Sequence, residues 1–467
     1  MSFRSNRRQF LGSVAALGAA TAVPPAALGR TASQCDFDVI VIGGGFAGAV
    51  ASRDCQKYGL RTLLLEARSR LGGRTFDTEW NGHHVELGGT WVHWMQPGIW
   101  REIHRYGLSV TETVGAVPDR LIARAENFSL DEEAGKVAEE IARGGDLYFE
   151  NARMLWERPW DPTYARAIHA ANDSVTMLDR LKQVKLTPLQ HHVVECFMET
   201  VVHNALEQGS YLEVARVFAL GGYQWSLFND VLTRYQITEG TGELIRRIAA
   251  DGRAEIKLSA PVSRIEQQPE FVRVHAGNVE HTARAVILAV PMNCLAGIDC
   301  VPALSAAKVA ASRERHAGSG LKFFAELKGR LGKVALIGAS STGIGSAFTY
   351  QELPNSTLIV GFSRDTRTLD ATSRSDMQRA LRRFIPNAEV LNCTRYPWVT
   401  DPFSLGTWCT YRPGKVLQWQ DALAAREGRI FMAGSDVSEG SRGFIDGAVL
   451  SGAHAAYQVA TSLSEKS

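Results

Sequence analysis

The chain has 467 residues, of which 45% are hydrophobic and 21% are charged, an ordinary composition for a soluble globular enzyme. A chain of this length buries a large core and is expected to form two or three domains. Its formal net charge is +2, and setting aside residues 1–30, with four arginines and no acid, leaves −2. Nothing in this charge argues for a nucleic acid partner.

Residues 1–34 are typical of a leader rather than of a fold. The run R-R-Q-F-L at residues 7–11 precedes a mildly apolar Gly/Ala stretch and the small residues P-P-A-A at 24–27. This order resembles a bacterial twin-arginine export signal and predicts a periplasmic enzyme, with a frayed N-terminal helix and a cytoplasmic location as the alternatives. The apolar stretch is too short and too rich in glycine to span a membrane, and no transmembrane span is predicted.

A dinucleotide-binding motif follows. Residues 39–42 form a short apolar strand, an Ala-rich helical run begins soon after it, and the turn between them has the spacing G-x-G-x-x-G. The glycines of that turn are Gly43, Gly45 and Gly48. Glycine permits the tight turn and lets backbone N–H groups approach a pyrophosphate at the helix N-terminus. A second apolar run, residues 62–65, ends at Glu66, a carboxylate suited to the two ribose hydroxyls of an adenosine.

Three dispersed features carry less information. The seven cysteines show no C-x-x-C pair, and the histidines at 83, 84 and 93 show no H-x-x-x-H spacing, so no metal site and no disulfide framework is predicted. Trp91, Trp94 and Trp100 lie close together in the sequence. Because large aromatic rings are costly to expose, these tryptophans either pack in a core or line a ligand cavity.

The next stretches differ in pattern. Residues from 119 to about 238 are predicted to be helical, as in the runs 131–147 and 188–206. Short β-like runs follow between 254 and 290, and strands with one helix, near 376–384, are predicted between 321 and 395. The last stretch contains a strand and turn at 429–436 and then a helix that begins near residue 443 and can face a phosphate with its N-terminus.

Two runs carry a resemblance to a known family. They are E-A-R-S-R-L-G-G-R at residues 66–74 and E-L-G-G-T-W at 86–91. They resemble the flavin-dependent amine oxidases, which include monoamine oxidases, polyamine oxidases and L-amino-acid oxidases, and weaker matches continue nearly to the C-terminus. The resemblance implies FAD rather than a nicotinamide, and an α/β fold in which a Rossmann-like FAD-binding domain, discontinuous in sequence, holds an inserted α+β substrate domain.

The pattern and the resemblance together divide the chain into six segments. The segments are a leader (1–34), FAD-binding parts at 35–118, 239–300 and 396–467, a helical substrate-domain part at 119–238 and a substrate-domain sheet part at 301–395. The resemblance places Val262 against the adenine and Trp398 against the isoalloxazine. The full set that it assigns to the cofactor is Gly43, Gly45, Gly48, Glu66, Ala67, Arg68, Arg74, Gly89, Thr90, Val262, Trp398, Gly434, Ser435, Asp436 and Ile445.

The resemblance also implies three catalytic positions. Lys322, within the apolar run L-K-F-F-A-E-L, matches a lysine that holds a water beneath the flavin, although a strand-end lysine that reaches solvent is the alternative. Trp408 and Phe444 match two facing rings that align an amine and exclude water. Animal monoamine oxidases bond a cysteine to the flavin just before the first ring, but this chain has Thr407 there, so non-covalent FAD is predicted.

The expected activity is FAD-dependent oxidation of a primary or secondary amine to an imine, which water hydrolyses to an aldehyde or ketone. Oxygen or a c-type cytochrome would take the electrons. The leader and three runs, L-L-L-E-A-R-S-R-L-G-G-R-T-F at 63–76, W-V-H-W-M-Q-P at 91–97 and D-P-F-S-L-G at 401–406, resemble bacterial nicotine and pseudooxynicotine oxidoreductases most. The nicotine enzyme has an asparagine where Phe444 stands, so the amine stays open. An L-amino-acid oxidase with Arg442 as carboxylate partner and a non-catalytic flavoprotein are the alternatives. The oligomeric state is also open, with a homodimer as one alternative.

Overall fold

The structure, a computed structural model, describes residues 35–465, so the expected export leader at 1–34 lies outside the described residues. Its first unit confirms the predicted strand, turn, helix and strand. β1 (Phe37–Ile42) ends at the glycine turn, α1 (Phe46–Lys57) begins directly after it, and β2 (Thr62–Leu65) runs parallel to β1. All of β2 and the last four residues of β1 are buried, as expected for parallel strands covered on both faces.

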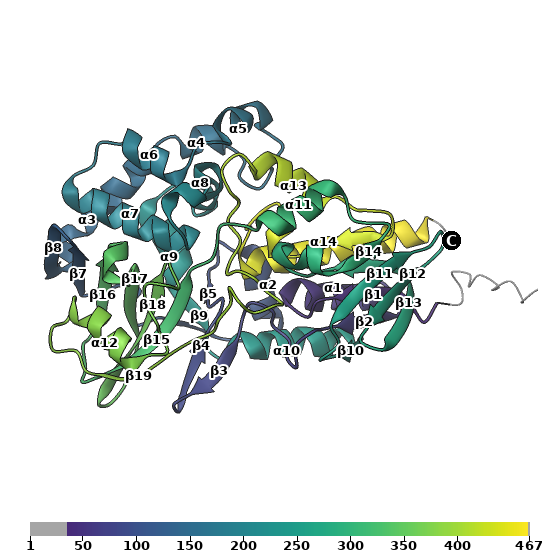
Figure 1. Ribbon diagram of the computed structural model, residues 1–467, viewed down its shortest axis with the longest axis horizontal. Coiled ribbons are helices and arrows are strands. Elements are labelled where there is room, and N and C mark those ends of the chain that lie inside the picture. Colours follow the sequence, from purple (N-terminus) through teal and green to yellow (C-terminus); the bar gives the residue numbers. More distant parts are fainter. Residues whose placement is uncertain (1–34, 466–467) are drawn as a thin grey trace, which may run out of the picture.

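Eight strands form the sheet around this unit (Figure 1). Their order is β10, β2, β1, β13, β12, β11 and β14, with β20 also paired to β13. The strands β10, β2, β1, β13 and β20 are parallel, whereas β12 is antiparallel to both of its neighbours. The further bounds are β10 (Glu255–Lys257), β11 (Val262–Gln267), β12 (Val272–Ala276), β13 (Val279–Leu288), β14 (Asp299–Val301) and β20 (Ile430–Met432).

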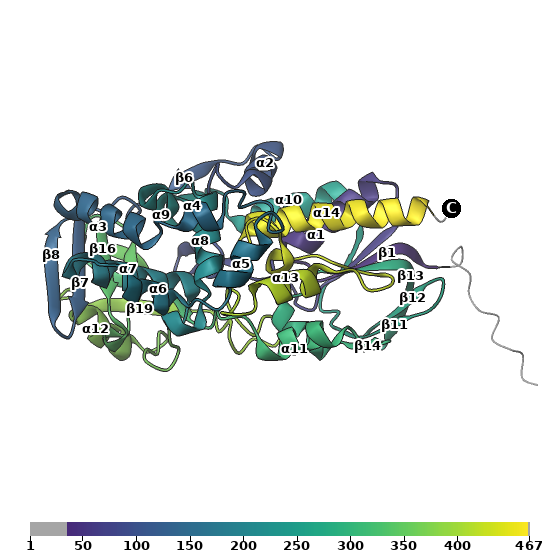
Figure 2. The same ribbon diagram turned by 90° about the horizontal axis from the view of Figure 1, so that it is seen from above.

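Helices cover both faces of this sheet (Figure 2). Val39 and Val41 share a core with one helical layer, while Ile40 and Ile42 point into the core on the opposite face. α1 and α14 cross at small residues, because a Cβ on Gly452 would lie 2.2 Å from a backbone oxygen of α1. The first layer consists of α1, α2 (Pro97–Arg105), α10 (Thr241–Gly252) and α14 (Ile445–Ser464), and the second face carries α11 (Ala306–Glu314) and α13 (Val416–Ala424).

A second, seven-stranded sheet forms the floor of the predicted substrate domain. Its central strands β15 and β18 are buried along almost their whole length, and α12 (Arg374–Arg382) packs against one face. Its order is β19 (Val390–Arg395), β15 (Leu321–Lys328), β18 (Ser356–Ser363), β17 (Ser346–Glu352), β16 (Val334–Gly338), β7 (Arg120–Ala125) and β8 (Phe128–Glu133).

The expectation that residues 119 to about 238 are helical is wrong at 120–133, which form the β7–β8 hairpin of this sheet, and at 235–237, which form a short strand. The acidic run 131–133 resembles a helix start, but β8 is an edge strand whose last three side chains, Asp131 to Glu133, are exposed, and β7 pairs with β16. The segment boundaries themselves stay predictions. The helices that follow are α3 (Ala134–Tyr148), α4 (Ala152–Leu155), α5 (Arg166–Asn172), α6 (Met177–Gln183), α7 (Pro188–Val202), α8 (Tyr211–Leu220) and α9 (Trp225–Thr233).

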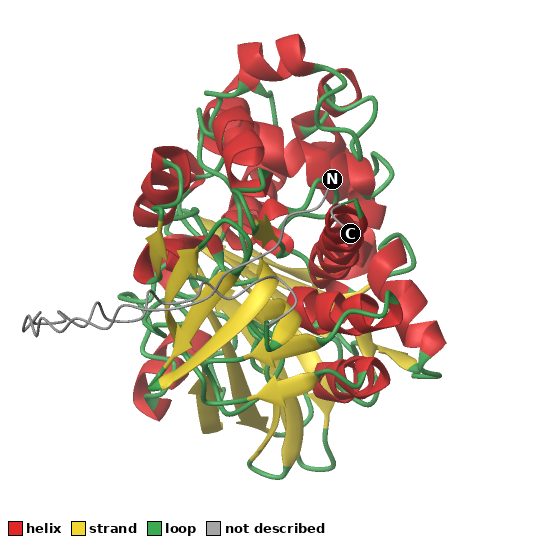
Figure 3. Ribbon diagram, turned by 90° about the vertical axis from the view of Figure 1, so that its right-hand side faces the viewer, coloured by secondary structure: helices red, strands yellow, loops and turns green. Residues whose placement is uncertain are grey.

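Short strands connect the two large sheets. They form a hairpin of β3 (Asp77–Trp80) and β4 (His83–Glu86) and a small sheet of β5 (Trp91–Val92), β9 (Tyr235–Ile237) and β6 (Val110–Glu112). Short 3-10 helices are η2 (Leu206–Gln208), η3 (Met292–Gly297), η4 (Ser340–Thr342) and η5 (Ser435–Val437). Figure 3 shows the helical insertion standing above the strands. Between residues 35 and 465, no helix combines the length and the apolar character that a membrane crossing requires.

Candidate functional site

The glycine turn between β1 and α1 leaves no room for side chains. Gly43 has a left-handed φ of +107°, and a Cβ there would lie 2.7 Å from the backbone oxygen of Ala289. A Cβ on Gly48 would lie 1.8 Å from the backbone oxygen of Gly43. Gly45 instead faces Gly73, whose Cα would lie 3.7 Å from a Cβ on Gly45, so backbone lies against backbone where a pyrophosphate is expected.

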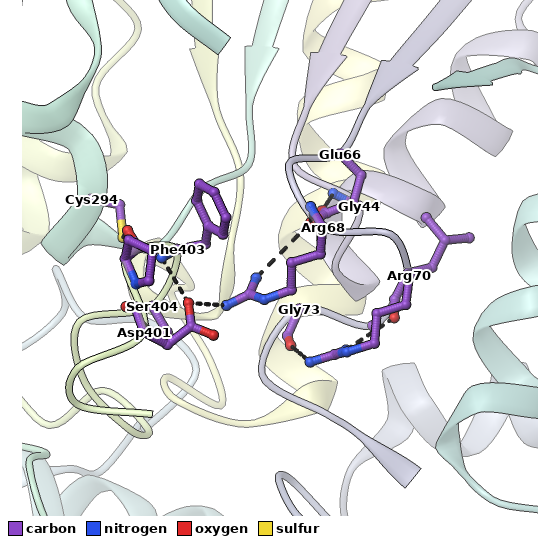
Figure 4. Close-up of polar contacts among 12 residues, drawn as sticks. Gly44, Glu66, Arg68, Arg70, Gly73, Cys294, Asp401, Phe403 and Ser404 are labelled. Atoms are coloured by element: carbon purple, nitrogen blue, oxygen red, sulfur yellow. Dashed lines mark hydrogen bonds and ion pairs between the residues drawn. The ribbon is translucent and has the colours of Figure 1, made fainter. Parts of the chain in front are cut away.

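Glu66 lies beside Gly44 and Arg68 at the glycine turn (Figure 4). Its Oε2 accepts the N–H of Gly44 at 2.5 Å and its Oε1 accepts the N–H of Arg68 at 2.8 Å. The side chain is buried and lines a cavity. Each oxygen therefore has one backbone donor and a further lone pair, which suits a carboxylate that accepts two vicinal hydroxyl protons.

Arg68 is oriented by an ion pair across the cavity. Its Nη2 donates to Asp401 Oδ1 at 2.8 Å, and its buried Nε has no partner in the described chain (Figure 4). Sequence analysis did not single out Asp401, since only the folded chain brings it beside Arg68. Arg70, also not singled out, donates to the backbone oxygens of Leu71, Gly73 and Thr75 and so fixes the second glycine turn.

Hydrogen bonds from the guanidinium of Arg74 connect the N-terminal motif to the C-terminal segment. Its Nη2 donates to Ser435 Oγ at 2.9 Å and to Asp436 Oδ1 at 2.5 Å, and its Nη1 donates to the backbone oxygen of Thr407 at 2.9 Å. Burial alone would raise the pKa of Asp436, but the charge of Arg74 holds it below its usual value. These contacts bring three distant stretches of the sequence to one wall of the cavity.

The predicted cofactor residues surround one cavity of about 280 Å³. Those that line it are Gly43, Gly45, Glu66, Ala67, Arg68, Arg74, Gly89, Val262, Trp398, Gly434, Ser435, Asp436 and Ile445. Gly48 and Thr90 do not: the first shapes the turn and the second lies in a neighbouring cavity. The Nε1 of Trp398 donates to the backbone oxygen of Leu87 at 2.9 Å, which fixes the indole in the wall.

Lys322 is buried at the far end of this cavity, and the solvent-reaching alternative is wrong. Its Nζ donates to the backbone oxygens of Glu86 and Gly88 at 2.6 and 2.7 Å and to Thr90 Oγ1 at 2.5 Å. Burial lowers the pKa of Lys322, while the nearby carboxylate of Glu86 opposes that change. The three close acceptors favour the ammonium form of Lys322, whereas burial disfavours it.

A second cavity, of about 620 Å³, adjoins the first between the seven-stranded sheet and the helices. The residues that line both cavities are Gly88, Gly89, Trp408, Gly443, Phe444 and Ile445. Trp408 and Phe444, predicted as a ring pair, thus stand at the junction. The Nε1 of Trp408 donates to the backbone oxygen of Val201 at 2.7 Å.

The expectation that the clustered tryptophans pack in a core or line a cavity holds for Trp91 and is wrong for Trp94. Trp91 lines the second cavity and contacts Phe348 and Phe362, with ring centroids 5.6 and 5.9 Å away. Trp94 is 47% exposed and packs against Trp100 outside both cavities. Within residues 35–465, no group of three or more His, Cys, Asp and Glu side chains is placed to hold a metal ion.

Arg442 lines the second cavity but is committed to a buried carboxylate. Its Nη1 donates to Glu213 Oε1 at 2.6 Å and its Nη2 donates to Gln420 Oε1 at 3.0 Å. Both members of the ion pair are less than 7% exposed. The expectation that Arg442 serves as a free cation for a substrate carboxylate is therefore not supported by the geometry.

Sequence analysis also missed His203, which lines the cofactor cavity beside Thr407 and Trp408. Its imidazole is stacked parallel to the indole of Trp408, with centroids 4.1 Å apart. No motif marks this histidine, because it follows α7 in the helical insertion and reaches Trp408 only through the fold.

Comparisons with known proteins agree with this geometry. The family described as flavin containing amine oxidoreductase matches residues 46–460. A pseudooxynicotine dehydrogenase from Pseudomonas sp. is 37% identical, over 99% of this chain and 97% of the relative, and a nicotine dehydrogenase from Pseudomonas putida (strain DSM 28022 / S16) is 35% identical, over 98% of each. The structure of a cyclohexylamine oxidase from Brevibacterium oxydans IH-35A matches with a TM-score of 0.76 at 21% identity, over 92% of this chain and 100% of that one, which shows the shared fold.

The cavity fits the FAD that these comparisons imply. The glycine turn presents backbone N–H groups without side chains, as a diphosphate requires, and Glu66 offers two oxygens to a ribose. The unpartnered Nε of Arg68 supplies a buried donor on the same wall. The lining then continues to Lys322, Trp398 and Trp408, where a flavin ring would meet the second cavity.

Proposed function

The chain belongs to the flavin-containing amine oxidoreductases and oxidises an amine with FAD, and on that basis we propose the kind of amine, the electron acceptor and the compartment. The proposed substrate is a primary or secondary amine with an apolar, ring-bearing group. Its oxidation gives an imine that water hydrolyses to an aldehyde or ketone. The observation that carries this proposal is the wall of the second cavity.

That wall is aromatic next to the junction with the cofactor cavity. The rings there are Trp91, Phe348, Phe362, Trp408 and Phe444. Aromatic faces bind flat apolar groups well and attract the positive edge of a partner ring. A cavity of about 620 Å³ also leaves room for a substrate larger than a short alkylamine.

Each charged residue in this wall has a charged or polar side-chain partner. Its charged residues are Glu213, Asp230 and Arg442. Glu213 binds Arg442, and Asp230 lies 3.1 Å from Arg234 and 3.4 Å from the imidazole of His93. A zwitterionic amino acid or a doubly charged diamine would bring an unpaired charge into this space at a high desolvation cost, whereas a neutral monoamine would not. This supports an amine substrate over the L-amino-acid alternative.

The protein groups have separate tasks in the reaction. When bound, the flavin accepts a hydride from the carbon beside the amine nitrogen. Trp408 and Phe444 flank the junction, where they exclude water and align the amine. Lys322 holds the segment from Glu86 to Thr90 against the junction through three hydrogen bonds from its Nζ.

The names of the two Pseudomonas relatives suggest the first substrates to test. One is called a pseudooxynicotine dehydrogenase and the other a nicotine dehydrogenase, and both names describe amines that carry a pyridine ring. We propose a pyridine-bearing secondary amine, as in pseudooxynicotine, with other aryl amines as the alternative. Because both names end in dehydrogenase, we propose a c-type cytochrome as acceptor, with oxygen as the alternative.

We propose that residues 1–34 are an export leader and that the enzyme is periplasmic. If the R-R-Q-F-L run directs export, a fusion of residues 1–34 to a reporter reaches the periplasm, and replacement of Arg7 and Arg8 by lysine keeps it in the cytoplasm. Equal distribution of both fusions would contradict the proposal. A homodimer stays a prediction, which light scattering of the purified enzyme tests.

The cofactor is predicted to be non-covalent, because Thr407 has no thiol and Cys409 is packed against Met292. Acid precipitation of the yellow protein is expected to leave all of the FAD in the supernatant. Flavin retained on the denatured chain would contradict this.

Anaerobic titration tests the proposed substrate. The purified enzyme is mixed with pseudooxynicotine, nicotine, phenethylamine, putrescine and L-amino acids, and the loss of flavin absorbance is followed. Bleaching by the pyridine amines or phenethylamine, but not by putrescine or L-amino acids, is expected. Bleaching by L-amino acids alone would overturn the proposal. Oxygen or cytochrome c added afterwards identifies the acceptor by the rate of reoxidation.

A further inference from the structure

Residues at the C-terminal end of α7 contact both the edge and the face of the indole of Trp408. The Nε1 of Trp408 donates to the backbone oxygen of Val201 at 2.7 Å. Two residues later, the imidazole of His203 lies parallel to the indole, with an interplanar angle of 0° and centroids 4.1 Å apart. A hydrogen bond at the edge and a stacked ring on the face together fix both the position and the plane of Trp408.

A hydrogen bond fixes the imidazole in turn. His203 Nδ1 lies 3.0 Å from Thr407 Oγ1, on the residue just before Trp408. The backbone of Thr407 is itself held, because its N–H donates to the oxygen of Gly318 at 3.0 Å and its oxygen accepts from Arg74 at 2.9 Å. The hydroxyl of Thr407 therefore presents a fixed partner to the histidine.

The surrounding chain accommodates this particular ring. His203 has a left-handed φ of 55°, an uncommon conformation for a residue with a side chain. A Cβ on Gly320 would lie 2.2 Å from the Cδ2 of His203, so only glycine leaves space for the imidazole. Phe362 packs edge-on against both His203 and Trp408, with centroids 6.0 Å from each.

The imidazole is neutral in this setting. His203 is fully buried, and burial lowers its pKa to about 3, with the positive charge of Lys322 acting in the same direction. A neutral ring shares one hydrogen bond with the hydroxyl of Thr407 through Nδ1, and its Nε2 has no hydrogen-bond partner among the described residues. The stack with Trp408 is then one between two uncharged rings.

We propose that His203 and Thr407 form a clamp that sets the plane of Trp408 against the amine, so that His203 is a positioning residue of the reaction. The inference rests on the proposed function, because it assumes that Trp408 faces the amine at the junction of the two cavities. A tilted indole would still allow binding in the second cavity, but it would hold the carbon beside the nitrogen away from its reactive alignment. The clamp therefore acts on the rate of flavin reduction more than on amine affinity.

Stopped-flow reduction under anaerobic conditions tests the clamp. Thr407→Val and His203→Phe each remove the hydrogen bond between the two residues, and the second keeps a stacked ring. Each is expected to lower the limiting rate of flavin reduction about tenfold or more with little change in the half-saturating amine concentration. The double variant is expected to be no slower than the slower single variant, because both changes break one contact.

Two controls separate positioning from general damage. Thr407→Ser keeps the hydroxyl and is expected to recover most of the rate. His192→Phe changes another buried histidine of α7, whose ring lies 4.8 Å from Phe128 outside both cavities, and is expected to leave the rate unchanged. Unchanged reduction rates in both Thr407→Val and His203→Phe, or fully additive losses, would overturn the clamp.

A measurement that does not depend on turnover tests the clamp without an amine substrate. Visible circular dichroism of the bound flavin reports the arrangement of the rings around it, and it is expected to change in Thr407→Val and not in His192→Phe. An identical signal in Thr407→Val would overturn the clamp. An absence of bleaching by every amine in the wild-type enzyme would instead count against the proposed function alone.

Discussion

Arg442 donates to Glu213 over 2.6 Å in the wall of the second cavity, and both side chains are nearly inaccessible to solvent. The pair places a positive and a negative charge in this wall and commits the Nη1 of Arg442 to the carboxylate of Glu213. Removing one partner therefore tests both the stability of the fold and the choice of substrate.

Glu213→Gln is expected to lower the free energy of unfolding by about 3–5 kcal/mol, since it leaves the guanidinium of Arg442 buried without its carboxylate. Chemical denaturation measures the loss. The matched control is Glu150→Gln, whose carboxylate pairs with Arg180 but is 61% exposed, and a change below about 1 kcal/mol is expected there. Equal effects of the two changes would contradict the buried ion pair.

Glu66→Ala is expected to weaken FAD retention, because it removes the acceptor of two backbone N–H groups and of the ribose hydroxyls. A loss of about 1.5–3 kcal/mol is the usual value for a charged hydrogen-bond partner, which is roughly a 10- to 150-fold weaker affinity. FAD occupancy after dialysis measures it. Glu255→Gln, on the neighbouring strand β10 and exposed, serves as the control, and equal occupancy in both variants would refute the assignment.

Lys322→Met is expected to keep FAD bound but to slow flavin reduction or reoxidation by roughly tenfold or more, because three acceptors at the junction lose their donor. Stopped-flow absorbance measures both steps. Lys328→Met lies on the same strand β15 but is 62% exposed, and it is expected to behave as the wild type. Unchanged kinetics in Lys322→Met would remove this lysine from the mechanism.

His316 makes the fold sensitive to acid. It is fully buried beside Arg74, and burial lowers its pKa to about 3, well below the value of about 6.5 in an unfolded chain. Between about pH 6.5 and pH 3 the unfolded state binds one more proton than the folded state. The contribution of neutral His316 to the free energy of unfolding is therefore fully present above about pH 6.5 and is lost as the pH falls toward 3. Stability is thus expected to fall with decreasing pH in this window.

His316→Gln removes that proton and is expected to make the fall shallower by up to about 1.4 kcal/mol per pH unit between pH 6 and pH 4. Denaturant titrations at several pH values give the slope. The exposed His454, on α14, is changed to glutamine as a control. Parallel slopes for the wild type and His316→Gln would show that this histidine does not titrate as described.

The nucleotide-binding half of the fold is predictable from sequence because its constraints are local. Gly43, Gly48 and Glu66 lie within one strand-helix-strand unit, and their spacing alone brings the turn and the carboxylate together. The need of Lys322 for polar partners is also predictable from sequence, since a lysine inside an apolar run requires them when the strand is buried. The structure supplies those partners.

The features that sequence analysis missed depend on contacts between distant segments. Residues 120–133 look helical by composition, but β7 pairs with β16 more than 200 residues later, and that pairing decides their structure. His203 gains its role only when α7 meets Thr407 and Trp408. Arg442 lies beside the predicted ring pair in sequence, but its ion pair with Glu213 means that it is not a free cation.

The most direct test of the central claim uses an amine with deuterium on the carbon beside the nitrogen. The amine that bleaches the flavin fastest is prepared in both isotopic forms, and the anaerobic rates of flavin reduction are compared. Deuterium is expected to slow bleaching by a primary isotope effect, and the expected product is the corresponding aldehyde or ketone. Equal rates for the two forms, or bleaching by L-amino acids and by no simple amine, would contradict the central claim.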